Sequence, residues 1–82
     1  MPDSSILVTG ARAPVALHLT RLLYGAGHRV ILADTPARPI AAASVACARY
    51  CRLPRPRFEP AAYAEAVEAL VRAEGIGLVI PT

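Results

Sequence analysis

The residues best suited to chemistry follow the first apolar segment of this 82-residue chain. Residues 5–9 (SILVT) are rich in β-branched side chains, and Gly10 follows them at once. Pro14 then suits the first position of a helix, where its missing N–H loses no hydrogen bond. Asp34 closes the next apolar segment, 24 residues after Gly10. A glycine turn between a strand and a helix, with an acid ending the second strand, is the setting in which α/β sheets bind the phosphates and ribose of a dinucleotide.

The details of this first loop favour a smaller anion. A dinucleotide fingerprint needs glycines that let the backbone approach the pyrophosphate. Ala13 and Ala16 instead occupy the spacings at which extended short-chain dehydrogenases and epimerases carry glycine (TGxxGxxG). Pro14 also removes one amide donor from the start of the helix. The amides near Ala11 and Ala13, together with Arg12 and the positive helix end, would suit a single carboxylate or phosphate.

Each of these loop residues also has a purely structural interpretation, which stays open. Gly10 can serve only as a tight turn between strand and helix. Asp34 can cap the loop that precedes Pro36, and Arg12 can be solvated.

Arginine supplies the positive charge of the side chains. The nine basic residues are all Arg, the net charge is +3 and the pI is near 9.4. Four of them gather around one short segment: Arg49, Arg52, Arg55 and Arg57. No nucleic-acid motif accompanies them, so we expect no nucleic-acid partner. We interpret this cluster as a solvated face, with an anion-binding or domain-docking surface as the alternative.

The cysteines and the apolar segments give no sign of a metal, a disulfide or a membrane. Cys47 and Cys51 have the spacing C-x-x-x-C, which is neither a redox pair nor a zinc pair with nearby partners, and we expect small buried thiols. Apolar runs end well before the roughly 20 residues that a membrane span needs. Residues 1–5 (MPDSS) lack a basic n-region. We therefore expect a cytoplasmic location and no membrane partner.

Apolar patterning places the loop within a regular succession of elements. Strands are expected at residues 5–9, 28–34, 49–53 and 76–80. Long helices are expected after Pro14 and Pro60, each ended by glycine, with a short Ala-rich helix over residues 40–48. The order predicts an α/β fold: a half-Rossmann three-layer domain whose four-stranded parallel sheet has the order 3-2-1-4.

This strand order locates the expected site. It reverses between strands one and four, so the crevice should lie beyond their carboxyl ends. The residues that flank it are Thr9, Gly10, Ala11 and Arg12 on one side and Pro81 and Thr82 on the other. The second long helix would cover its sheet face alone. Because all-parallel sheets are covered on both faces, we expect that face to be incomplete and the isolated chain to be marginally stable or self-associating.

Four segments, taken in order, resemble the N-terminal, pre-ATP-grasp domain of ATP-grasp enzymes. They are ILVTGARAPVAL, AGHRVILAD, residues 44–50 with the following CRLP, and PAAYAEAVEALVRAEGIGLVIPT. The resemblance is to carboxylate–amine ligases and to the large chain of carbamoyl phosphate synthase, and it covers nearly the whole chain. Its specific part is GHRVILAD followed by GIGLVIPT.

The resemblance implies that residues 1–82 are the pre-ATP-grasp domain of a longer chain, with the missing ATP-grasp domain as partner. The parent enzyme would bind ATP and magnesium and activate a small carboxylate substrate as an acylphosphate, which an amine then attacks. The nucleotide lysines and metal-binding acids of that family lie in later domains, and this sequence contains no lysine. We therefore expect the chain alone to be inactive. Supportive contacts to substrate would come from the matching positions Thr9, Gly10, Ala11, Arg12, Asp34, Pro81 and Thr82.

Two other functions stay open. The first is a truncated NAD(P)-binding epimerase or reductase domain, which glycine at position 13 or 16 would have supported. The second is a stand-alone docking module that uses its bare sheet face and the surface of residues 49–57.

Overall fold

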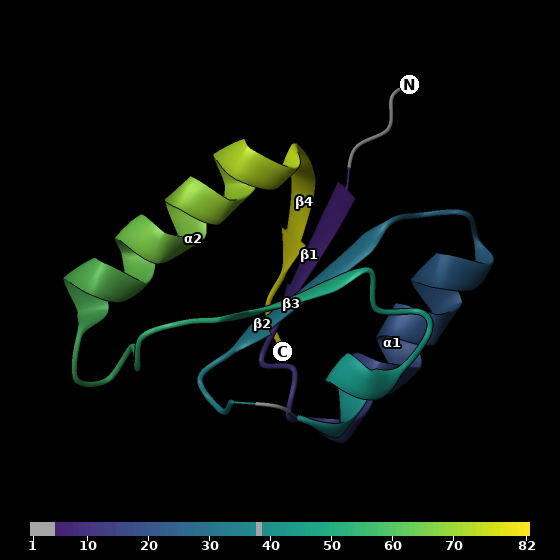
Figure 1. The fold of residues 1–82 in the computed structure, drawn as a ribbon, viewed down its shortest axis with the longest axis horizontal. Helices are drawn as coiled ribbons and strands as arrows, with labels where there is room; N and C mark the ends of the chain where they lie inside the picture. The colour runs from purple at the N-terminus through teal and green to yellow at the C-terminus, as the bar shows by residue number, and fades with distance from the viewer. Residues whose placement is uncertain (1–4, 38) are drawn as a thin grey trace.

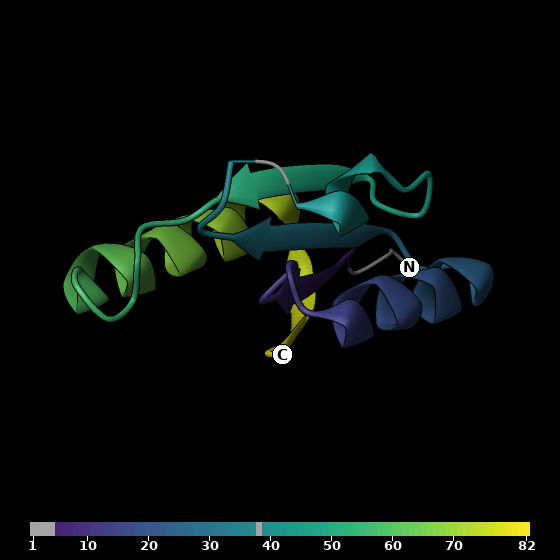
Figure 2. The same cartoon turned by 90° about the horizontal axis from the view of Figure 1, so that it is seen from below.

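The structure of the chain is a computed structural model that describes residues 5–37 and 39–82. Its elements are β1 (Ser5–Thr9), α1 (Pro14–Gly25), β2 (Val30–Asp34), the 3₁₀ turn η1 (Ile40–Ala43), β3 (Arg49–Arg52), α2 (Pro60–Glu74) and β4 (Ile76–Ile80). The strands form one parallel sheet of order β3-β2-β1-β4, which confirms the predicted α/β class and strand order. α1 and η1 lie on one side of the sheet and α2 on the other (Figures 1 and 2).

The core consists of two apolar layers, one on each face of the central strands. Successive strand residues point to opposite faces of a sheet. Ile6 and Val8 accordingly pack in the layer under α1, whereas Leu7 packs in the layer under α2. Every residue of β1 and β2 is buried, as expected of parallel strands covered on both sides.

Two predicted boundaries are wrong by more than one residue, each for a local hydrogen-bonding reason, and the third strand ends at Arg52 rather than at residue 53. The second strand begins at Val30 rather than at residue 28, because the N–H of His28 donates to the Leu23 carbonyl (3.0 Å) and belongs to the end of α1. The Ala-rich helix covers only four residues instead of residues 40–48. Ser44 ends it: its Oγ accepts from the Ala46 N–H (3.1 Å), which offers the backbone an alternative to the helix.

β4 is one of the two edge strands, and its middle residues are exposed on both faces, whereas Ile76 and Ile80 at its ends pack against the core. Leu78 pairs with Ile6 and so shares the α1 face, whereas Val79 pairs with Leu7 and shares the α2 face. Their exposed fractions are 53% and 39%. The incomplete covering predicted for the α2 face therefore extends to both sides of this strand. Neither α1 nor α2, the helices of the described residues, is long and apolar enough to cross a membrane.

Candidate functional site

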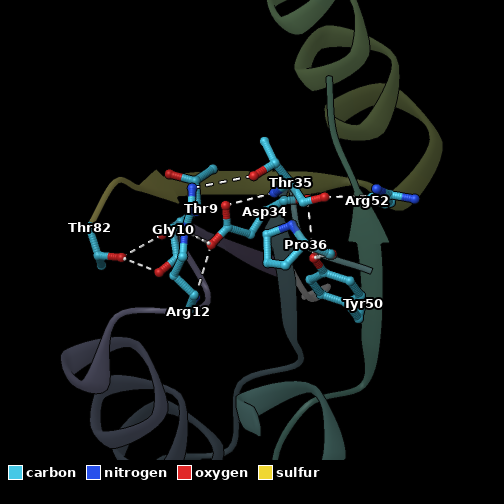
Figure 3. Close-up of polar contacts among 9 residues, drawn as sticks. All are labelled: Thr9, Gly10, Arg12, Asp34, Thr35, Pro36, Tyr50, Arg52 and Thr82. Carbon is cyan, nitrogen blue, oxygen red and sulfur yellow. Dashed lines mark hydrogen bonds and ion pairs between the residues drawn. The ribbon is translucent and has the colours of Figure 1, made fainter. Parts of the chain in front are cut away.

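The predicted crevice at the carboxyl ends of β1 and β4 is bridged by a direct contact (Figure 3). The Thr82 hydroxyl lies 2.6 Å from the Thr9 carbonyl oxygen and 3.0 Å from that of Gly10, so it donates to this pair. Gly10 has a φ of +72°, and a Cβ added there would lie 2.5 Å from the Thr82 backbone oxygen. Both the left-handed backbone and the close approach of Thr82 therefore require glycine at this turn.

The amides expected to hold an anion in the first loop are already engaged. The N–H of Ala11 donates to the Ala33 carbonyl (3.4 Å), and that of Ala13 donates to the Gly10 carbonyl (3.0 Å). The backbone N–H of Arg12 donates to Asp34 Oδ2 (2.9 Å). Folding thus satisfies these donors within the chain, so an anion held by the amides near Ala11 and Ala13 would have to replace these hydrogen bonds.

Asp34 fixes the shape of this loop. Its carboxylate is only 5% exposed. Oδ2 accepts from the Arg12 backbone and lies 3.2 Å from Arg12 Nε, while Oδ1 accepts from the Thr35 N–H (2.6 Å). These contacts are the ones that the structural interpretation of Asp34 as a loop cap predicts. Arg12 is two-thirds exposed, but it is ion-paired rather than merely solvated.

These contacts also bear on the dinucleotide interpretation. In a dinucleotide site the acid that ends the second strand accepts from ribose hydroxyls. Here both oxygens of Asp34 accept from the protein. Ala16, in the first turn of α1, is fully buried against the sheet, in the position where the last glycine of such a fingerprint permits close helix–sheet packing. Neither observation favours NAD(P).

Two residues that the sequence analysis did not select, Tyr50 and Thr35, complete this end of the sheet (Figure 3). The Tyr50 hydroxyl lies within hydrogen-bonding reach of the carbonyl oxygens of Asp34 (3.1 Å) and Pro36. Burial raises the pKa of Tyr50, and the nearby Asp34 carboxylate adds to the effect, so the phenol stays a donor. Thr35 accepts from two arginines: Arg12 Nη2 reaches its Oγ1 (3.3 Å), and Arg52 Nε reaches its carbonyl oxygen (2.8 Å). The sequence could have suggested Thr35, which directly follows β2. Tyr50 is the second residue of β3 and pairs with Leu32, and only its side chain reaches this end of the sheet.

The arginine cluster predicted from the sequence is divided by the fold. Arg49 lies at the amino end of β3, where it pairs with Glu74 (2.5 Å), and Glu74 also pairs with Arg29 (2.9 Å). At the carboxyl end of the strands, Arg12 rather than Arg49 lies beside Arg52, Arg55 and Arg57. These four side chains line one surface hollow of about 550 Å³.

The two cysteines are free, and the described residues offer no metal site. Cys47 and Cys51 are free and half-buried, and burial raises the pKa of Cys47. Within residues 5–37 and 39–82, no three His, Cys, Asp or Glu side chains come together to hold a metal.

Comparison with protein-family models finds no match for this chain, and comparison with curated proteins finds none at a significant level.

Proposed function

We propose that residues 1–82 are the substrate-side N-terminal domain of a cytoplasmic ATP-grasp ligase, which activates a small carboxylate as an acylphosphate for attack by an amine. The proposal is supported by the ordered likeness of four segments to pre-ATP-grasp domains, from ILVTGARAPVAL to GIGLVIPT. The sheet order is compatible with it. The observation that carries it is the contact of Thr82 with Thr9 and Gly10. Thr82 belongs to the last of the similar segments and Thr9 and Gly10 to the first, and the contact lies where the strand order of the sheet reverses.

In this proposal the chain supplies a rigid wall rather than catalytic groups. Thr82 holds the end of β4 against the first loop, and Asp34 holds that loop against β2. Arg12 is the one positively charged side chain that this loop presents to solvent. Binding and positioning of a carboxylate are the contributions such a wall can make. Nucleotide, magnesium and phosphoryl transfer belong to the ATP-grasp domain of the parent enzyme.

The first test is the reading frame on the 3′ side of the Thr82 codon in the source DNA. We expect several hundred further codons that encode a glycine-rich loop, nucleotide-contacting lysines and late paired acids. A frame that encodes a Y-x-x-x-K catalytic pair instead would move the chain to the epimerases. An immediate stop codon would contradict the ligase proposal.

One observation favours a docking module as a second candidate. β4 has one unpaired edge, and Leu78 and Val79 are exposed on its two faces. Such edges pair with other chains unless they are covered. A monodisperse homodimer in light scattering at micromolar concentration would support this candidate. A monodisperse monomer would count against it.

A further inference from the structure

The carboxyl ends of β2 and β3 carry a hollow whose charged lining is entirely positive among the described residues. Its lining includes Arg12, Arg52, Arg55 and Arg57, with Thr35 and Phe58 between them. Glu59 lines the adjoining hollow, but not this one. The volume of about 550 Å³ lies within the range typical of small-molecule sites.

Two of the four guanidinium groups are held in place before any ligand arrives (Figure 3). Thr35 accepts from Arg12 through its side chain and from Arg52 through its carbonyl oxygen. Figure 3 shows Asp34 and Thr35 between these two arginines, which come from different elements of the fold. Arg52 uses Nε for this bond, so its two terminal nitrogens keep the paired donors that bind an oxyanion in a fork.

The positive charge of the hollow is only partly compensated. Asp34 pairs with Arg12, and the other ion pairs between described residues engage Arg29 and Arg49 at the opposite end of the sheet. No carboxylate of the described residues pairs with Arg52, Arg55 or Arg57. The guanidinium carbon of Arg55 lies 6.0 Å from the centre of the Phe58 ring, at the outer limit of a cation–π contact. Like charges gathered in this way repel one another, and a bound anion would relieve the repulsion.

A second hollow, of about 510 Å³, shares Arg12 and Pro36 with the first. Its remaining lining is almost entirely apolar and includes Pro14, Leu17 and Ile40. Ile40 is 86% exposed, although it is a large apolar side chain. A ligand could therefore place an anionic group among the arginines and an apolar group beside Leu17 and Ile40.

We propose that these two hollows bind a small phosphate monoester, with its dianionic group among Arg12, Arg52, Arg55 and Arg57 and its organic part in the apolar hollow. A doubly charged group with three acceptor oxygens suits several guanidinium forks better than a single carboxylate does. This site is separate from the amides of the first loop, and the proposal does not depend on the ligase assignment.

The test is a titration of the chain with phenyl phosphate at pH 7.5, followed by calorimetry and by amide chemical shifts. We expect one-to-one saturable binding with a Kd below about 1 mM. Shift changes should centre on Thr35, Arg52 and Phe58. Arg52→Gln should weaken binding roughly 10- to 100-fold, because that is the effect of losing one charge-assisted hydrogen bond. Arg21→Gln, an exposed position on α1 outside both hollows, should leave the affinity unchanged.

Inorganic phosphate and benzoate separate the two parts of the proposal. Both should bind more weakly than phenyl phosphate, the first for lack of an apolar group and the second for lack of a dianion. Three results would each overturn the proposal. They are no binding at millimolar phenyl phosphate, equal loss in the Arg21 and Arg52 variants, and tighter binding of a short oligonucleotide with shifts spread over all arginines.

Discussion

Substitution of Gly10 by alanine should destabilise the domain through two separable effects. The φ of +72° places position 10 in the left-handed region, which costs a residue with a Cβ about 1–2 kcal/mol. The added methyl would also lie 2.6 Å from Thr82 Oγ1 and 2.5 Å from its backbone oxygen, so Thr82 must move. Loss of its hydrogen bond to the loop adds about 1 kcal/mol. We expect a total of about 2–3 kcal/mol, or a fall in Tm of about 10–20 °C for a domain of this size.

Two other glycines of the same chain isolate these effects. Gly75 has nearly the same φ, +65°, but a Cβ there would meet nothing within 4 Å, so Gly75→Ala measures the backbone cost alone. Gly25 ends α1 without a positive φ and is equally open, so Gly25→Ala should be neutral or slightly stabilising. Urea denaturation followed by far-UV circular dichroism gives the free energy of unfolding for each variant. If Gly10→Ala costs no more than Gly75→Ala, the contact with Thr82 does not stabilise the fold and the reasoning is refuted.

Three further predictions concern other parts of the molecule. The hydrogen bond from Arg29, with the charge of Arg49, lowers the pKa of Glu74. The ionised Glu74 side chain therefore stabilises the fold fully above the ordinary glutamate pKa, and this stabilisation is lost as the pH falls through the lowered pKa. Glu74→Gln should therefore lower the urea midpoint at pH 7 and flatten its decline in acid; parallel curves for variant and parent would contradict this. Tyr50→Phe should cost about 1 kcal/mol, because its hydroxyl donates to a backbone carbonyl, and an unchanged urea midpoint would refute that role. Leu78→Lys should reduce concentration-dependent self-association in light scattering, whereas a parent chain that is already monomeric and melts cooperatively above roughly 65 °C would contradict the expected marginal stability.

The sequence was sufficient to predict the architecture because each element has a strong local signal. β-branched residues marked β1, β2 and β4, Pro14 and Pro60 marked the helix starts, and glycines marked the helix ends. The alternation of helices and strands then left few topologies, and the predicted order was confirmed. The region after residue 43 was harder, because the preference of alanine for helix competed with a Ser44 side chain that bonds its own backbone.

The site was less predictable because its chemistry depends on contacts between distant residues. Sequence spacing grouped Arg49 with Arg52, but these residues lie at opposite ends of β3. Arg12 joins the cluster only because β1 and β2 are neighbours in the sheet. Whether the amides of the first loop are free to bind a ligand depends on their acceptors within the chain. One of these acceptors is Asp34, 22 residues away from Arg12.

The central claim is that this domain lines the carboxylate site of an ATP-dependent ligase. The most direct test is ADP release by the complete protein encoded at the locus, measured over a panel of small carboxylates with and without amine donors. We expect ADP release that requires both a carboxylate and an amine. Absence of ADP release with every pair, together with binding of NADH by the same protein, would contradict the claim.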